Sequence, residues 1–152
     1  QVGRLLIKNK ITVSVAESCT SGLLQYIFSH AEEAMKFYQG GMTVYNVGQK
    51  AKQLNINPIF AEECNAVSKE IAEKMSLEIA KKFNSEMGIS ITGYAEPIPE
   101  DGIESSFAYI SFSKNGEIMH SKRILGKTGA SLADNQNIFA DKVLIDLINI
   151  LK

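Results

Sequence analysis

The residues of this chain that could do chemistry gather in one short stretch, Ala16-Glu17-Ser18-Cys19-Thr20-Ser21-Gly22. The stretch lies between a strand-like run, Ile11–Val15, and a helix-like run, Leu23–Phe28. The first N–H groups of a helix lack internal partners and carry positive partial charge, so this corner favours an anion or a polarised nucleophile. A simpler interpretation is that Ser18 or Thr20 only caps the helix. The local residues leave both interpretations open.

A serine nucleophile needs a base to activate it. His30 and His120 are the only histidines, and isolated histidines are more often surface or terminal residues than site residues. A lysine is therefore the better candidate, and Lys50 follows the end of a predicted strand at Tyr45 by about one helical turn. To act as a base, Lys50 must be desolvated enough to be neutral part of the time.

Other groups at the same strand ends could assist such a serine. Backbone N–H groups near Ser18 and Gly22 are candidate donors to an oxyanion. Tyr45 and Thr92 are candidates for positioning a substrate. Each of these residues also has a purely structural interpretation, since Lys50 lies on a polar helix and Thr92 precedes a strand-end glycine. From the residues alone, an enzyme and a ligand-binding module remain equally open.

The elements that must position these groups follow from the hydrophobic periodicity. Ser68 is a predicted N-cap of the clearest amphipathic helix, Asn115-Gly116 predicts a tight hairpin, and Pro58 is interpreted as a chain break. The predicted elements are helix 2–10, strand 11–16, helix 22–29, helical turn 31–36, strand 42–45, helices 50–54 and 68–84, strands 88–93, 107–113 and 117–125, and a C-terminal helix 138–151.

This order predicts an α/β fold, a three-layer α/β/α sandwich with a mixed sheet and helices on both faces. Ligands of such sheets collect at the carboxyl ends of the parallel strands. The predicted strand ends carry Glu17-Ser18, Tyr45 and Thr92-Gly93. We therefore expect three polar corners to converge on one pocket, with Gly40-Gly41 allowing a close backbone approach or a bulge at the second strand.

Composition limits the classes of function. A length of 152 residues suits a single domain over residues 1–152, and 16 basic against 17 acidic residues give a net charge of −1. We therefore expect no nucleic-acid partner, and no apolar run is long enough for a membrane helix. No signal peptide is visible and the two cysteines lack metal-site spacing, which predicts a cytoplasmic protein without a metal site. The chain begins with Gln1, which is not a start methionine.

Five segments resemble, in order, the motifs of the CinA C-terminal domain family, the nicotinamide mononucleotide deamidases. Val15–Gly22 resembles its AESCTGG motif and Phe37–Gly41 its F-x-G-G segment. Tyr45–Lys50 is similar to its Y-S-N-x-x-K segment, and Asn65–Ser68 to its G-A-V-S helix start. Ile91–Pro97 lies at its T-G-x-A-G-P motif. The resemblance spans nearly the whole chain.

The resemblance implies a hydrolase that converts the carboxamide of nicotinamide mononucleotide into nicotinate mononucleotide and ammonia, with no metal or organic cofactor. It implies a compact α/β/α domain that is often a homo-oligomer and whose partner is a small, nucleotide-like amide. Carried over by motif, Ser18 is the nucleophile, and Lys50 and Tyr45 assist it. The implied substrate-binding set is Glu17, Thr20, Gly22, Gly41, Thr92 and Gly93.

The chain also departs from the family pattern. Ser21 replaces the second glycine of the first motif, Asn46-Val47 replaces serine and asparagine, and Glu96 replaces the glycine of T-G-x-A-G-P. No arginine follows Arg123, where the family has arginines suited to a phosphate, and only Lys127 is nearby in sequence. We expect the serine and lysine to persist while phosphate recognition is weakened or changed. This leaves a slow deamidase, an amidase for another small molecule, or a non-catalytic binder.

Overall fold

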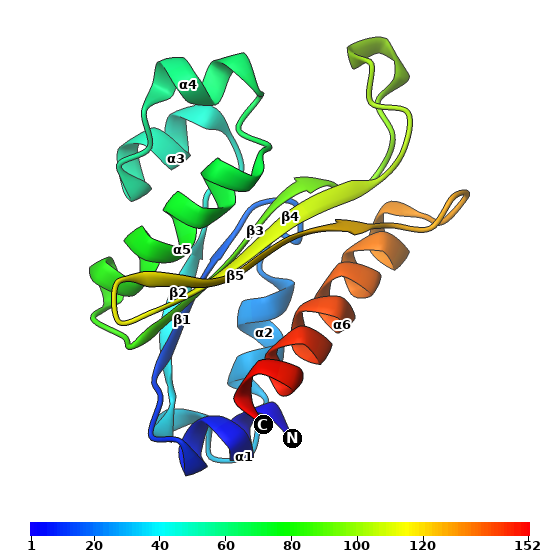
Figure 1. The fold of residues 1–152 in the computed structure, drawn as a ribbon. Coiled ribbons are helices and arrows are strands. Elements are labelled where there is room, and N and C mark those ends of the chain that lie inside the picture. The colour runs from blue at the N-terminus through cyan, green and yellow to red at the C-terminus, as the bar shows by residue number, and fades with distance from the viewer.

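A five-stranded mixed sheet forms the centre of the computed structural model, which describes residues 1–152 (Figure 1). Across the sheet the strands run in the order β2-β1-β3-β4-β5. Strand β1 is parallel to both β2 and β3, whereas β3, β4 and β5 are antiparallel to their neighbours. The strands are β1 (Val13–Glu17), β2 (Tyr38–Thr43), β3 (Met87–Tyr94), β4 (Phe107–Lys114) and β5 (Glu117–Leu125).

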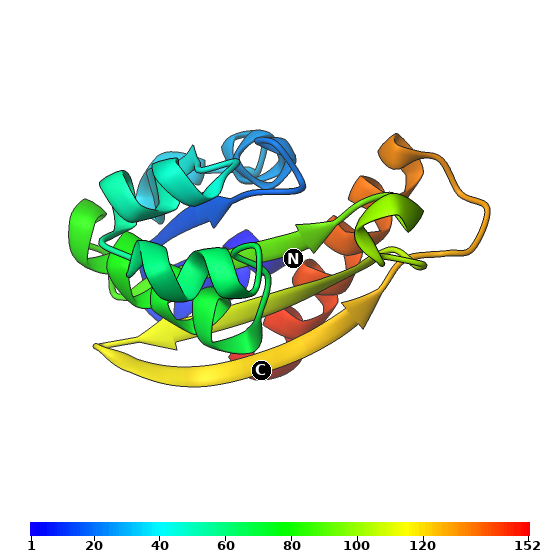
Figure 2. The same cartoon turned by 90° about the horizontal axis from the view of Figure 1, so that it is seen from above.

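Helices cover both faces of this sheet, which confirms the predicted three-layer fold. On one face lie α1 (Val2–Lys8), α2 (Leu23–Ser29) and α6 (Leu132–Leu151). On the other lie α3 (Val47–Leu54), α4 (Pro58–Glu63) and α5 (Lys69–Phe83), and the view from above shows the strands passing between this group and α6 (Figure 2). Two 3₁₀ turns, η1 (Ala34–Lys36) and η2 (Pro99–Asp101), complete the chain.

The two faces of the sheet have different chemistry because side chains alternate along each strand. The face toward α2 and α6 is apolar and contributes to a core of 21 buried residues that includes Val15, Ile89, Phe112 and Phe139. The face toward α3, α4 and α5 contributes to a smaller cluster of nine buried residues, which includes Ala16. Ser14 and Ala16, the small residues of β1, lie on the face that receives α5.

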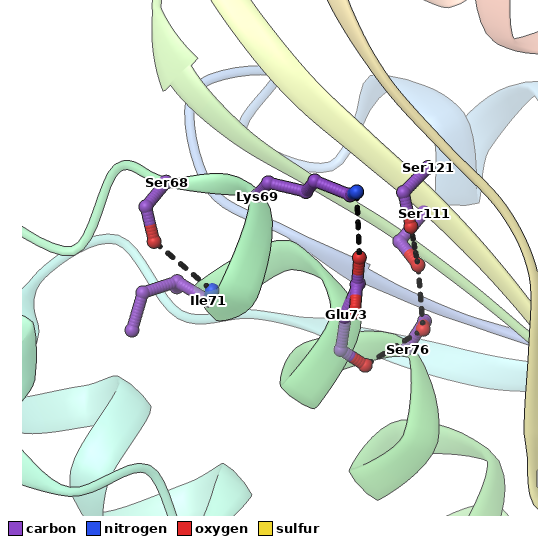
Figure 3. A network of polar contacts seen from close by, with 7 residues as sticks. All are labelled: Ser68, Lys69, Ile71, Glu73, Ser76, Ser111 and Ser121. Carbon is purple, nitrogen blue, oxygen red and sulfur yellow. Dashed lines mark hydrogen bonds and ion pairs between the residues drawn. The ribbon is translucent and has the colours of Figure 1, made fainter.

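Buried serines attach α5 to the sheet. Ser76 Oγ on α5 lies 3.1 Å from Ser111 Oγ on β4, which in turn lies 3.3 Å from Ser121 Oγ on β5 (Figure 3). The helix also approaches β3 closely, since a Cβ added to Gly88 would lie 1.8 Å from the Ser76 carbonyl oxygen. Short polar side chains and a glycine therefore let α5 lie nearer the sheet than large apolar residues would allow.

The middle of β2 also requires glycine. A register shift opposite Val13 and Ser14 marks a bulge, and Gly40 there has φ +128°. A Cβ on Gly41 would lie 2.4 Å from the Val15 carbonyl oxygen of β1. Both predicted reasons for the glycine pair, a bulge and a close approach, are confirmed. The pairing aligns the ends of β1 and β2, where the chemically capable residues lie.

Several element boundaries differ from those predicted. The second strand begins at Tyr38 rather than Met42, and α3 begins at Val47 rather than Lys50. Pro58 does not break the chain but starts α4, because the Asn57 side chain caps the helix by accepting from the amides of its first turn. The C-terminal helix begins at Leu132, six residues before the predicted start, with Ser131 as its cap.

Other local predictions are confirmed. The Ser68 side chain accepts a hydrogen bond from the Ile71 amide and caps α5 (Figure 3). Asn115 and Gly116 have φ of +51° and +81°, as a type I′ hairpin requires. None of the helices combines the length and the apolar character needed to cross a membrane.

Candidate functional site

Ser18 and Lys50 meet at the carboxyl ends of the parallel strands β1 and β2. Ser18 follows the last residue of β1 directly, and Lys50 lies in α3, shortly after β2. Lys50 Nζ donates to Ser18 Oγ at 3.0 Å and to the Val44 carbonyl oxygen at 3.0 Å. The pair therefore satisfies the distance requirement for proton transfer between a nucleophile and its base.

The start of α3 determines where the Lys50 side chain points. Asn46 Oδ1 accepts from the Gln49 amide at 2.9 Å, and the Asn46 carbonyl oxygen accepts from the Lys50 amide at 3.0 Å. This cap begins the helix directly after β2 and places Lys50 on its buried side. The neighbouring Lys52 is exposed on the same helix. The sequence of this helix is polar and did not indicate that Lys50, unlike Lys52, points inward.

Burial changes the acidity of Lys50. The residue is only 2% exposed, and this desolvation lowers the pKa of its ammonium group from an ordinary value of 10.5 to about 8. At pH 7, about one molecule in ten then carries a neutral Lys50, compared with fewer than about one in a thousand for an ordinary lysine. The neutral amine can accept a proton from the Ser18 hydroxyl, which the ammonium form cannot.

Glu17, the last residue of β1, holds the turn that presents Ser18. Its buried carboxylate accepts from the amides of Leu24 and Gln25 at 2.8 and 2.9 Å and from Thr20 Oγ1 at 2.6 Å. Gln25 Nε2 donates to the same carboxylate at 3.0 Å. Glu17 thus caps the first turn of α2, where a negative charge is favoured by the free amides. The geometry gives Glu17 and Thr20 a role in shaping the corner.

The backbone between Ser18 and α2 is a tight turn. Ser21 and Gly22 both have positive φ, +51° and +98°. Ser21 thus adopts a backbone conformation that favours glycine. The turn is closed by hydrogen bonds from Ser21 N to Ser18 O and from Leu23 N to Thr20 O. The Cys19 amide, next to Ser18 in the pocket lining, donates to no other residue of the protein and remains available to a ligand.

The thiol of Cys19, next to Ser18, is less acidic than an ordinary thiol. Cys19 is 6% exposed, and burial raises the pKa of its thiol to about 12. The thiol therefore stays protonated in the pH range of ordinary enzymes and is a poor nucleophile. Cys19 is therefore a small buried residue rather than a second nucleophile.

A pocket of about 530 Å³ opens in front of the Ser18–Lys50 pair. Its walls come from the turn after β1, the start of α3, the segment between α4 and α5, the end of β3 and the start of α6. Five lining residues are apolar and aliphatic: Val47, Val67, Ala95, Ile98 and Leu132. Tyr45 and Tyr94 add two aromatic rings, and Asn46, Asn65 and Glu96 add polar side chains.

The structure divides the predicted site residues into two groups. Ser18, Tyr45, Lys50 and Gly93 line the pocket. The Tyr45 side chain is 63% exposed and makes no hydrogen bond to the protein through its hydroxyl, so it can bind a ligand. These four residues come from the three strand ends that were expected to converge.

The other predicted site residues are not in the pocket lining. Glu17 and Thr20, described above, are two of them. Thr92 is buried, and its hydroxyl donates to the Ala66 carbonyl oxygen at 2.6 Å. Gly41 faces the backbone of β1 and Gly22 precedes the first residue of α2. Their positions indicate support of the pocket walls, and their direct contact with a substrate stays a prediction.

Three polar side chains that the sequence gave little reason to single out hold the segments that form the pocket. Asn65 Nδ2 donates to the Tyr94 hydroxyl at 3.0 Å and joins two walls of the pocket. Gln136 Nε2 of α6 donates to the Cys19 carbonyl oxygen at 2.9 Å, so it anchors the turn that follows Ser18. Asn135 Nδ2 donates to the Ala95 carbonyl oxygen at 2.8 Å and holds the chain after β3. Only the family-like helix start near Asn65 pointed toward any of them.

The histidines lie elsewhere. His120 Nε2 pairs with Asp146 at 2.9 Å between β5 and α6, and His30 is exposed at the end of α2. No three His, Cys, Asp or Glu side chains gather into a possible metal site. Among the basic side chains, Lys50 is thus the one that reaches Ser18.

Comparison with known proteins gives a consistent result. A family model described as the CinA C-terminal domain matches residues 1–150. A putative competence-damage inducible protein of Clostridium kluyveri is 36% identical over 120 residues, which cover 77% of this chain and 29% of that protein. A CinA-like protein of Dictyoglomus thermophilum is 34% identical over 119 residues, covering 76% of this chain and 28% of that protein. The chain thus spans less than a third of the length of the curated relatives it matches.

Solved structures have the same fold. The competence or damage-inducible protein of Enterobacter asburiae superposes with a TM-score of 0.91 at 24% identity, over 99% of this chain and 94% of that one. A CinA superfamily protein of Escherichia coli superposes with a TM-score of 0.84 at 26% identity, over 99% of this chain and 84% of that one. The sheet order and the helical layers are therefore those of these proteins.

Proposed function

Because the chain belongs to the CinA C-terminal domain family, we propose that it is an amidohydrolase of the nicotinamide mononucleotide deamidase type, with Ser18 as nucleophile and Lys50 as base. The observation that carries the proposal is the 3.0 Å contact between Lys50 Nζ and Ser18 Oγ in a buried corner that opens into a pocket. Burial supplies the neutral lysine that a serine nucleophile requires.

In the proposed reaction, neutral Lys50 accepts the Ser18 hydroxyl proton while Ser18 Oγ attacks the carboxamide carbon. The carbonyl oxygen becomes an oxyanion, for which the free amide of Cys19 in the pocket lining is the available donor. The carbon–nitrogen bond then breaks, and the proton on Lys50 passes to the leaving nitrogen, which departs as ammonia. Water, deprotonated by the same lysine, cleaves the acyl ester and releases the carboxylate product and free Ser18.

Tyr45 supports the proposal from the pocket wall. Its exposed ring and free hydroxyl lie at the end of β2, near the element that carries Lys50. The hydroxyl can donate to the substrate carboxamide, and the ring can pack against the substrate ring. Gly93 lines the pocket at the end of β3, where a Cβ would lie 2.4 Å from the Phe107 carbonyl oxygen, so glycine is required for the close approach of β4.

Ammonia release from nicotinamide mononucleotide tests the function directly. We expect Ser18→Ala to reduce the rate by about 10³-fold or more, since removal of a catalytic serine has effects of that order. Lys50→Arg keeps a positive charge but cannot accept the proton, so it is expected to be inactive as well. Ser105→Ala removes an exposed hydroxyl outside this pocket and serves as the matched control.

An alternative function is suggested by Glu96, which lines the pocket where the family motif has glycine. A chain with this substitution could bind a ligand without hydrolysing it. If the unaltered protein and Ser18→Ala release ammonia at the same rate from every amide tested at micromolar enzyme, the amidohydrolase proposal is wrong and the binding function takes its place.

A further inference from the structure

The charge of the pocket lining is unusual for a nucleotide site. Of its 15 lining residues, only Lys50 and Glu96 have an ammonium or carboxylate side chain. Lys50 is buried, and its amine is already engaged by Ser18 and Val44. Glu96 is exposed and forms no ion pair. The one solvent-exposed charge of the lining is therefore a carboxylate.

The loop that carries Glu96 strengthens this negative charge. Three more carboxylates, Glu100, Asp101 and Glu104, follow within the same loop, and no lysine, arginine or histidine occurs between Lys82 and Lys114. Figure 1 shows the loop between β3 and β4 standing out from the end of the sheet. Charges of one sign around a cleft raise the local concentration of opposite charges and exclude like charges.

The nearest basic side chains along the chain are engaged elsewhere. Arg123 stacks on the Phe107 ring, 4.3 Å from its centroid, and does not line the pocket. Lys127 is exposed and lines a separate, smaller hollow beside Pro97 and Glu104. The bidentate arginine contact that commonly fixes a phosphate is thus missing from the lining.

The uncharged walls suit a flat cationic ring. Tyr45 and Tyr94 present aromatic rings, and a cation over the face of a tyrosine is attracted by its quadrupole. Tyr94 is held in place by the Asn65 side chain and by edge-to-face packing on Phe107, with ring centroids 5.5 Å apart. Ile98 and Leu132 add apolar surface for the rest of the ring.

We propose that this pocket selects carboxamides that carry a cationic ring and no phosphate, so that the nucleoside form of the amide is preferred over the mononucleotide. The proposal rests on the amidohydrolase function and names its substrate class. Glu96 is the residue that determines this specificity, because its carboxylate attracts the ring cation and repels a phosphate. One feature favours the opposite preference: the first-turn amides of α3, at Val47 and Gly48, lie in the lining and could receive a phosphate.

Binding to Ser18→Ala tests this preference without requiring turnover. Nicotinamide riboside and nicotinamide mononucleotide share the pyridinium carboxamide and differ in the phosphate, so calorimetric titration of each isolates its effect. We expect the riboside to bind at least about tenfold more tightly, a difference of about 1.4 kcal/mol. Neutral nicotinamide, which lacks the ring cation, should bind more weakly than the riboside. Raising the salt concentration should reduce the riboside's advantage, because exposed charges are screened.

The charge reversal Glu96→Lys in the same Ser18→Ala background identifies the responsible group. We expect it to reduce the riboside-to-mononucleotide preference by about tenfold or more, whereas the matched control Glu100→Lys, in the same loop but outside the lining, should change it by about twofold at most. Tighter binding of the mononucleotide, or equal effects of the two reversals, would overturn the substrate-class proposal. Both results are independent of ammonia release, so failure of the amidohydrolase proposal would be seen separately.

Discussion

Replacing Lys50 by methionine should abolish activity and make the protein more stable at neutral pH. The folded protein holds this amine at a pKa of about 8 instead of 10.5. At pH 7, the 2.5-unit difference corresponds to about 3 kcal/mol of unfavourable charge burial, at about 1.4 kcal/mol per unit. Methionine has a similar length and no charge, so Lys50→Met removes this cost.

Lost hydrogen bonds offset part of this gain. Methionine leaves the Val44 carbonyl oxygen and the Ser18 hydroxyl without the donor they have in the unaltered protein, at about 1 kcal/mol for a group that stays buried. Ser18 borders the pocket, where water can replace the lysine. We therefore expect a net stabilisation of about 1 to 2 kcal/mol at pH 7, measured by urea unfolding.

The pH dependence of this difference is the sharper test. Because the folded-state pKa lies below the unfolded value, the unfolded chain binds more protons between about pH 8 and 10.5, and the unaltered protein gains stability as the pH rises through this window. The advantage of Lys50→Met should shrink by about 2 kcal/mol between pH 7 and pH 9.5. Cys19 titrates in both proteins, so its effect largely cancels in the comparison.

Lys52→Met is the matched control, because Lys52 is exposed on the same helix. Its effect should stay within about 0.5 kcal/mol and should not depend on pH. If Lys50→Met were less stable than the unaltered protein at pH 7, or if its difference did not change with pH, Lys50 would not be a desolvated amine, and its proposed role as a base would lose its physical foundation.

Three further outcomes follow from the same contacts. The rate of ammonia release should rise about tenfold per pH unit below the pKa of Lys50 and level off above about pH 8, because the neutral amine is the reactive form; a profile flat between pH 6 and 8 would contradict this. Glu17→Ala removes the cap from the Leu24 amide and three other donors, and thermal unfolding should show a loss of about 2 to 4 kcal/mol; a loss below about 1 kcal/mol would mean that water replaces the carboxylate. Gly88→Ala places a Cβ 1.8 Å from the Ser76 carbonyl oxygen and should cost about 3 kcal/mol in urea unfolding, whereas Gly48→Ala, with 3.6 Å to its nearest neighbour, should cost less than about 1 kcal/mol.

The sequence predicted the parts of the fold that depend on local signals. The four-residue recurrence of apolar side chains and the Ser68 cap identified α5, and Asn115-Gly116 identified the hairpin between β4 and β5. The helix α4 was missed because Pro58 was interpreted as a break, whereas at the first helical position proline loses nothing. The early turns of α6 were missed because residues 132–137 are mostly polar and show no apolar stripe. The side chains of Asn135 and Gln136 bond instead to backbone carbonyls of other segments.

The site was predictable where it depends on strand ends and unpredictable where it depends on side-chain direction. Parallel pairing of β1 with β2 and β3 brings Ser18, Tyr45 and Gly93 to one edge of the sheet, as the order of elements indicates. The inward turn of Glu17 was not visible, because a carboxylate beside a candidate nucleophile has the same sequence whether it faces a ligand or caps a helix. Only the hydrogen bonds to the first turn of α2 distinguish the two.

The arrangement also explains how the reactive corner can persist while the substrate-facing wall changes. Ser18 and Lys50 are fixed by contacts among β1, β2, α2 and α3, which belong to the packed body of the domain. Glu96 belongs to a loop that stands out from the sheet and is closed on itself by the pairing of Ile98 with Ile103 (Figure 1). A substitution at Glu96 therefore alters the charge of the pocket lining and leaves the contacts of Lys50 with Ser18 and Val44 unchanged. If the proposed roles are correct, we expect mutations at Glu96 to change substrate preference while the contact between Lys50 and Ser18 is kept.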